Sequence, residues 1–323
     1  MKARFATPLV TVVLLLLMLG IGGALYPGFL SVQVMFNLVI DNAFLLVLAV
    51  GMGFVILSGG IDLSVGAVLA LATMISAWLM HALHWPPVLA MAAVLSLGAL
   101  FGAAMGALIH YFKLQPFIVT LAGMFLARGL CYLISIDSIT ISDPVYLALS
   151  QAQLPLLGGF LSPSALVALA LLAVGIWLAH YTAFGRSVYA IGGNEQSALM
   201  MGLPVARTKV LVYAFSGFCA ALAGVLFSLY MLSGYALHAQ GTELDAIAAV
   251  VIGGTLLSGG YGYVAGALSG VLVLGTIQTL IAFDGTLNSW WTRIVIGALL
   301  FLFCVVQRVM AMGVKQGQTK ETT

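Results

Sequence analysis

The sequence predicts an all-helical integral membrane protein with about ten transmembrane helices. Of the 323 residues, 63% are hydrophobic and only 6% are charged, whereas roughly a quarter of the residues are charged in a typical soluble domain. These few charged side chains cannot cover the surface of a protein that lies in water. Lipid must therefore cover most of the protein surface. Apolar stretches also recur along the whole chain, and a helix is the element that satisfies its own backbone inside a bilayer.

Ten apolar stretches are candidate spans, because a hydrocarbon core about 30 Å thick needs around 20 helical residues. The eighth stretch is short enough to be a re-entrant segment instead. In chain order the stretches are Pro8–Leu25, Asn37–Leu57, Gly66–Leu83, Pro87–His110, Phe117–Ile136, Ser164–Tyr181, Val210–Leu232, Leu244–Leu257, Tyr263–Ile281 and Trp290–Val306.

The basic residues predict that both termini are cytoplasmic, since Lys and Arg accumulate in cytoplasmic loops. With ten crossings and an inner N-terminus, Arg128 and Arg293 are the two basic residues left over. The first stretch could instead be a cleaved signal peptide, although the Tyr26–Gly28 turn leads straight back towards another span. The basic residues on the inner side are Lys2, Arg4, Lys113, Arg186, Arg207, Lys209, Arg308, Lys315 and Lys320.

Two long loops carry further information. The outer loop, about 137–163, holds two aspartates and no basic residue, and its Pro, Ser and Gly content predicts irregular structure. The inner loop, about 182–209, holds a short helix signature. Asn194 can cap that helix, Glu195 suits its positive end, Gly202 can close it in the left-handed conformation and Pro204 prevents continuation.

This two-turn helix is too short to be stable alone, and it presents Leu199, Met200 and Met201 on the cytoplasmic side. Exposed apolar residues on such a helix favour a docking surface for another protein. The alternative is a helix that lies back on the membrane surface.

The chain also contains an internal echo. Ser58-Gly59-Gly60 precedes Gly66-Ala67 at the same spacing with which Ser258-Gly259-Gly260 precedes Gly266-Ala267, and both follow an apolar stretch. Glycine-interrupted helices in the two halves of a transporter often line the transport path. Two tight turns between closely packed helices would give the same pattern.

Several kinds of chemistry are missing from the sequence. It has no GxxxxGK[ST] loop, so it cannot be an ATPase, and it has no HExxH, GxSxG or metal-spaced His/Cys group. We therefore expect no catalytic residue, no metal site and no enzyme. A self-contained secondary transporter would need coupling groups inside its spans, yet Arg128 is the one charge well inside a span, with Asp41 near an end.

Three motifs resemble the permeases of ribose, xylose, arabinose and galactoside ABC importers: Val55–Gly66, Gly185–Glu195 and Gly202–Val205. The resemblance covers essentially the whole chain, and 283–293 looks most like one of the two permeases of a galactofuranose importer. It implies a single permease domain, residues 1–323, with the all-helical type II fold of vitamin-B12-type importers.

The resemblance also implies partners. These are a cytoplasmic ATP-binding subunit that holds the ATP and Mg, a second permease subunit in a heterodimer or homodimer, and a periplasmic sugar-binding protein. The chain itself would need no cofactor, would bind no nucleic acid and would lie in the bacterial inner membrane, where it moves a monosaccharide by alternating access.

Three groups of site residues follow as predictions. Asp62 has two alternative roles, capping of the helix that it precedes and a contact to the ATP-binding subunit. One of Asn37 and Asn42 at most should face the path, since they are about 140° apart round a helix. Trp290 and Trp291 would anchor a span at the interface or stack on sugar. The predicted coupling residues are Arg186, Asn194, Glu195, Leu199, Met201, Gly202, Pro204 and Arg207. The predicted path residues are Asn37, Asn42, Ser58, Asp62, Arg128 and Ser258, and the predicted docking residues for the binding protein are Asp137, Asp143, Glu243, Asp245 and Asp284.

Overall fold

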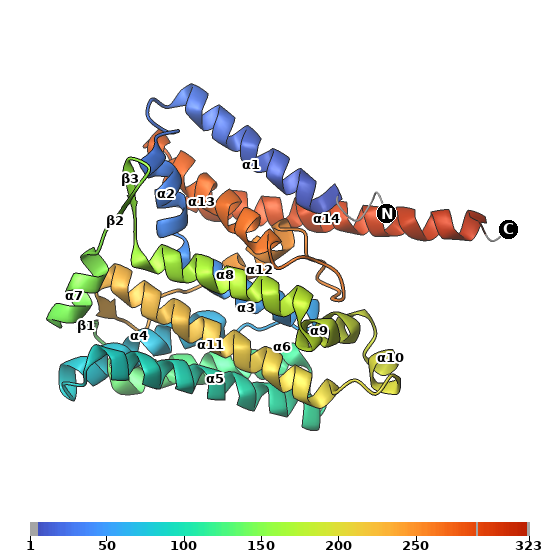
Figure 1. Cartoon of the computed structure of the whole chain (residues 1–323), viewed down its shortest axis with the longest axis horizontal. Helices are drawn as coiled ribbons and strands as arrows, with labels where there is room; N and C mark the ends of the chain where they lie inside the picture. The colour runs from blue at the N-terminus through green and yellow to red at the C-terminus, as the bar shows by residue number, and fades with distance from the viewer. Residues whose placement is uncertain (1–5, 289, 322–323) are drawn as a thin grey trace.

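The computed structural model describes residues 6–288 and 290–321, with side chains from 9–288 and 290–305. It is a bundle of helices with two small antiparallel sheets at one end (Figure 1). The helices of the bundle begin with α1 (Ala6–Leu25), α2 (Val32–Ile40), α3 (Ala43–Leu57), α4 (Val65–Ala82), α5 (Pro87–Tyr111) and α6 (Pro116–Ile134). They continue with α8 (Pro163–Tyr181), α11 (Val205–Met231), α12 (Thr242–Ile252), α13 (Gly266–Asp284) and α14 (Trp290–Glu321).

The centre of the bundle is α3, in which every residue from Leu45 to Leu57 is buried. It packs against α11, α12 and α8, while α11 packs along α5. Glycine allows that last approach, since a Cβ on Gly102 would lie 2.1 Å from the Tyr213 carbonyl oxygen. Close backbone contact of this kind replaces the hydrophobic effect in holding membrane helices together.

One predicted span, Asn37–Leu57, is broken in the structure. Helices α2 and α3 meet at an angle of 51°. At the break the Asn42 side chain donates a 3.0 Å hydrogen bond to the Leu38 carbonyl. A side chain that inserts into the backbone hydrogen bonds of a helix in this way is a recognised cause of kinks.

The outer loop is more ordered than the sequence predicts. It contains β1 (Ile139–Thr140), α7 (Pro144–Gln151) and a hairpin of β2 (Leu154–Leu156) and β3 (Gly159–Leu161). Strand β1 pairs with β4 (Ser233–Gly234), which follows α11. Irregular structure was therefore the wrong expectation for much of this loop, because proline at the first position of a helix starts α7 rather than breaking it.

The inner loop holds two helices where the sequence predicted one. These are α9 (Ala183–Gly193) and α10 (Glu195–Met200). Figure 1 shows both at the same end of the bundle as the beginning of α1 and the end of α14. Of the basic residues that predicted the orientation, Lys2 and Arg4 lie outside the described residues, as do the side chains of Arg308, Lys315 and Lys320.

The prediction of about ten transmembrane helices is wrong. Within the described residues, six helices are long and apolar enough to cross a membrane, or seven if α2 and α3 form one bent span. In α1 and α14 the parts whose side chains are described, Leu9–Leu25 and Trp290–Val305, are apolar but fall below that length. In the predicted stretch Leu244–Leu257, helix α12 has only 11 residues, which rise about 16 Å, roughly half of the hydrocarbon core.

Candidate functional site

Helix α10 has the boundaries and caps that the sequence predicts. The Asn194 side-chain oxygen accepts a 2.8 Å hydrogen bond from the Ser197 N–H, which satisfies a free donor at the helix start. Gly202 takes the left-handed conformation after the helix, with φ at 77°. This local prediction is confirmed, and it leaves a six-residue helix at the tip of the inner end.

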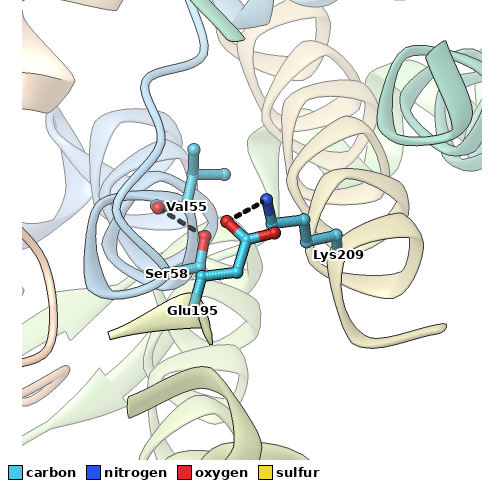
Figure 2. A network of polar contacts seen from close by, with 4 residues as sticks. All are labelled: Val55, Ser58, Glu195 and Lys209. Atoms are coloured by element: carbon cyan, nitrogen blue, oxygen red, sulfur yellow. Dashed lines mark hydrogen bonds and ion pairs between the residues drawn. The ribbon is translucent and has the colours of Figure 1, made fainter. Parts of the chain in front are cut away.

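Helix α10 is braced against α11 by one ion pair. The Glu195 carboxylate lies 2.7 Å from the Lys209 ammonium, and Figure 2 shows the two side chains pointing toward each other. The start of α10 exposes polar side chains, and its end exposes apolar ones. Leu199, Met200 and Met201 are 64%, 87% and 68% exposed.

Beside α10, a basic pocket of about 490 Å³ opens between α9 and the start of α11. Its lining includes Arg186 and Arg207 with the apolar walls of Phe184 and Leu203. Both arginines are exposed, and neither has an ion-pair partner among the described side chains. The pocket therefore has two guanidinium groups free to bind a carboxylate.

Three segments that are far apart in the chain meet at the end of α9, just before α10, in a glycine junction, which we define as Gly59, Gly192, Gly193, Gly259 and Gly260. A Cβ on Gly192 would lie 1.8 Å from the carbonyl oxygen of Leu57, and a Cβ on Gly259 would lie 2.7 Å from the Cα of Gly59. At Gly192, Gly259 and Gly260 the contact is backbone on backbone, with no space for a side chain, whereas a Cβ on Gly193 would point into open space.

A hydrogen bond completes this junction. The Gly260 N–H donates to the Leu57 carbonyl at 2.9 Å, so the turn before α13 is bonded to the end of α3. The Tyr189 hydroxyl ties α9 to the same turn through the Gly262 carbonyl, at 2.9 Å. The end of α9, which leads directly into α10, therefore rests on both turns of the internal echo. This geometry favours tight turns between packed helices as the explanation of the echo.

The predicted path residues lie at different depths and in different settings. Asn42 is buried and bonded to the Leu38 carbonyl, whereas Asn37 is half-buried. The Ser58 hydroxyl donates to a carbonyl of its own helix (Figure 2), and Ser258 is exposed. The structure does not bring these residues together, and their role in a path stays a prediction.

Asp62 is fully buried between α3 and α4. One carboxylate oxygen accepts hydrogen bonds from the Ser64 N–H and hydroxyl at 3.0 and 2.6 Å, and the other accepts from the Ser216 hydroxyl at 2.8 Å. The carboxylate thus joins the start of α4 to α11. It has the partners that a buried polar group requires.

Arg128 reaches from α6 into the irregular segment that follows α11. Its guanidinium donates to the carbonyl oxygens of Ala236 and His238. Close by in the chain, one Glu243 carboxylate oxygen and the His238 Nδ1 are buried without a hydrogen-bond partner. Arg128 orders an irregular backbone segment, which at membrane depth is tolerated where protein or a wet cavity surrounds it.

The acids predicted to dock a binding protein differ in what they contact. Asp137 is exposed, whereas Asp143 is half-buried and accepts hydrogen bonds from two N–H groups at the start of α7. Asp284 accepts from Thr286 and from the Tyr26 hydroxyl. The remaining two, Glu243 and Asp245, are half-buried at the start of α12. A docking role for these five stays a prediction.

Sequence reasoning missed the roles of α9 and of the Gly192-Gly193 pair. The signal was present, because Thr182 can cap a helix and its side chain does accept from the Gly185 N–H at 3.2 Å. Another pair of adjacent glycines, at 192–193, also stands within a motif that was quoted only for its resemblance.

Comparison with known proteins identifies the class. A family model described as the branched-chain amino acid transport system / permease component matches residues 34–304, and the chain belongs to this family. The inner membrane ABC transporter permease protein YjfF of Escherichia coli (strain K12) is 52% identical, over 92% of this chain and 90% of that protein.

Two further relatives carry a substrate in their names. The fructose import permease protein FruG of Bifidobacterium longum (strain NCC 2705) is 42% identical over 94% of this chain and 92% of its own. The ribose import permease protein RbsC of Escherichia coli (strain K12) is 34% identical over 92% of each chain. No solved structure matches the chain.

These relatives settle several predictions. The resemblance to ribose- and xylose-type importer permeases is confirmed, and so is the prediction that the chain is a permease subunit rather than an enzyme. With its apolar helices, the chain is a multi-pass inner membrane protein. The predicted vitamin-B12-type fold is wrong, because the matching family is that of the branched-chain amino acid transport permeases.

Proposed function

We propose that this chain is the translocating subunit of an ATP-driven importer that moves a monosaccharide across the inner membrane by alternating access. The observation that carries the proposal is α10, a short helix with three exposed apolar residues at its end, which directly follows the glycine junction at the end of α9. The relatives named for fructose and ribose support a sugar as the cargo. Galactofuranose is the proposed sugar, on the resemblance of residues 283–293.

A separate ATP-binding subunit supplies the energy and holds the ATP and Mg. The exposed side chains of α10, with Met200 the most exposed, bury themselves in that subunit, since well-packed apolar anchors contribute most of the free energy of an interface. An acidic side chain of the same subunit pairs with Arg186 and Arg207 in the basic pocket and orients the contact.

Movement of the ATP-binding subunits then reaches the interior through the glycine junction. Because Gly192 touches the end of α3 and Gly260 is bonded to it, a shift of α10 is applied to both turns of the echo at once. A packed backbone contact has few alternative arrangements, so it transmits a displacement rather than absorbing it.

The proposal also includes the orientation of the chain in the membrane and two further partners. The end of the bundle that carries α10 is cytoplasmic, together with both termini. A periplasmic sugar-binding protein docks at the opposite end, near the exposed Asp137, and a second permease subunit completes the transporter.

Purified chain in sealed vesicles tests the proposal against its rival, a self-contained secondary sugar transporter. Uptake of labelled ribose, xylose, fructose and galactofuranose is measured with the chain alone under an ion gradient, and then with the ATP-binding subunit, the second permease, the binding protein and ATP. We expect uptake only in the complete assembly with ATP. Uptake by the chain alone, driven by the ion gradient, would contradict the proposal.

A further inference from the structure

A pocket of about 460 Å³ lies at the outer end of the bundle, between α12, α13 and α14. This volume falls in the range of about 300–1,000 Å³ that small-molecule sites occupy in proteins. Four of its lining residues are polar, and the rest are mainly aliphatic. The polar ones are Asp245, Gln278, Thr292 and Arg293.

The polar groups of this outer pocket are not fully used within the chain. The Asp245 carboxylate and the Arg293 guanidinium are 3.7 Å apart, which is longer than a hydrogen bond. A second Arg293 nitrogen donates to the Gln240 carbonyl at 3.2 Å and holds the guanidinium in place. Both charged groups therefore keep donors and acceptors for a bound molecule.

Gln278 gives an independent observation. Its side chain is exposed on α13, a helix long enough to span the membrane, and no hydrogen bond to it is found among the described residues. A polar side chain costs free energy in a lipid-facing position. An amide that lines the pocket instead can donate and accept at once.

The walls and rim of the pocket suit a ring with polar edges. Ile281, Leu287 and Ile296 provide apolar contact, and Trp290 and Trp291, which directly precede the lining residue at 292, are both exposed. A sugar presents hydroxyl groups at its edge and C–H groups on its faces. Apolar walls with a few convergent polar groups match both parts.

We propose that the outer pocket binds a monosaccharide, with the Asp245 carboxylate accepting from hydroxyls, Arg293 donating to them and Gln278 doing both. The inference rests on the proposed function and adds a sugar site at the outer mouth of this subunit. The charges of Asp245 and Arg293 offset each other, which favours a neutral polyol over a simple anion. A zwitterionic amino acid is the competitor, since it too could bridge the pair.

The test uses the purified chain in lipid nanodiscs and equilibrium binding of labelled D-ribose, D-xylose, D-fructose and galactofuranose, with L-leucine as the competing amino acid. We expect saturable binding of at least one sugar that leucine does not displace. Gln278→Leu and Asp245→Asn should each raise the Kd about tenfold, the effect of one lost hydrogen bond that involves a polar or charged group. Gln151→Leu, the same change at an exposed glutamine that ends α7, should leave the Kd unchanged.

Three results of the binding assay would overturn the inference: no saturable sugar binding by the unchanged chain, displacement by leucine, or equal binding by Gln278→Leu. A loss of binding-protein docking in Asp245→Asn with normal sugar binding would also overturn it. None of these results contradicts the proposed function if the complete assembly still shows ATP-driven uptake. In that assembly Gln278→Leu should raise KM about tenfold at nearly constant kcat, because it removes binding and no chemical step.

Discussion

The two ends of the bundle are held together in different ways. At the inner end, the glycine junction joins α3, α9 and the turn before α13 through backbone atoms alone. At the outer end, side-chain contacts add to the backbone pairing of β1 with β4. The Tyr146 hydroxyl bonds to Ser228 at 2.5 Å, Asp143 caps α7, and Asp245 faces Arg293 across the outer pocket.

This difference indicates that the two ends of the bundle have different functions. A backbone contact without side chains cannot change its length by a change of rotamer, so the inner end is suited to transmitting a displacement. Side-chain contacts can be exchanged for contacts with a solute or a docking protein, since a hydrogen bond within the protein contributes only about 0.5–1.5 kcal/mol net. The outer end is therefore suited to recognition.

The largest effect should come from Gly192→Ala in the glycine junction. The new Cβ would lie 1.8 Å from the Leu57 carbonyl oxygen, so the backbone must shift, at a cost of about 1–3 kcal/mol typical of overpacking. ATP-driven sugar uptake by the assembled transporter should fall at least about tenfold, since overpacking at a transmitting contact displaces α10.

The neighbouring residue provides the matched control. A Cβ on Gly193 would meet nothing within 4 Å, so Gly193→Ala should keep both uptake and thermal stability. Equal uptake by the two variants would show that the junction transmits nothing.

The largest effect on assembly, rather than on uptake, should come from Met200→Glu on α10. Met200 is 87% exposed, so the folded chain should keep its thermal unfolding temperature. Burying an unpaired carboxylate in the interface should weaken assembly with the ATP-binding subunit by about 2 kcal/mol or more, roughly 30-fold. Co-purification measures the assembly, and Leu157→Glu at the tip of the outer hairpin, 81% exposed, should leave it intact.

A smaller effect separates the outer acids. Asp143→Ala removes the side-chain cap of α7 and should cost about 1 kcal/mol of stability, measured by thermal unfolding. Asp137→Asn should leave stability unchanged, because this side chain is exposed, and should reduce docking of the binding protein in a salt-dependent way. If Asp137→Asn lowered the thermal stability and Asp143→Ala did not, the structural role would belong to Asp137 and this assignment would be wrong.

The smallest effect should come from Glu195→Gln, which removes the pair with Lys209. The Glu195 side chain is half exposed, at 50%, and such pairs contribute only about 0.2–1 kcal/mol. Uptake should fall less than threefold at low salt and not at all at high salt. A tenfold loss would show that Glu195 itself contacts the ATP-binding subunit.

Local features of the candidate site could be predicted from the sequence. The caps of α10 depend on residues within nine positions of each other, Asn194 to Gly202, so short-range chemistry determines them. The echo of Ser58-Gly59-Gly60 in Ser258-Gly259-Gly260 likewise predicts two similar turns.

The remaining features depend on tertiary packing. The glycine junction brings together residues 59, 192 and 259, and no local pattern states that these meet. The number of spans was overestimated because apolar composition continues through the short helix α12 and beyond its end at Ile252. Arg128 lies within helix α6, inside the span predicted for it. Its acceptors, however, are the backbone carbonyls of Ala236 and His238, and the types of side chain along the sequence do not predict a backbone acceptor.

One distance tests the central claim that α10 and the glycine junction move as one body. Spin labels on Gln196→Cys in α10 and Leu257→Cys beside the junction, both exposed positions, report that distance in the assembled transporter, with Cys304→Ser to remove the half-buried thiol. The account predicts one narrow distance that is the same with and without ATP, and a broadened distance in Gly192→Ala. A distance in the otherwise unchanged chain that shifts when ATP binds would contradict it.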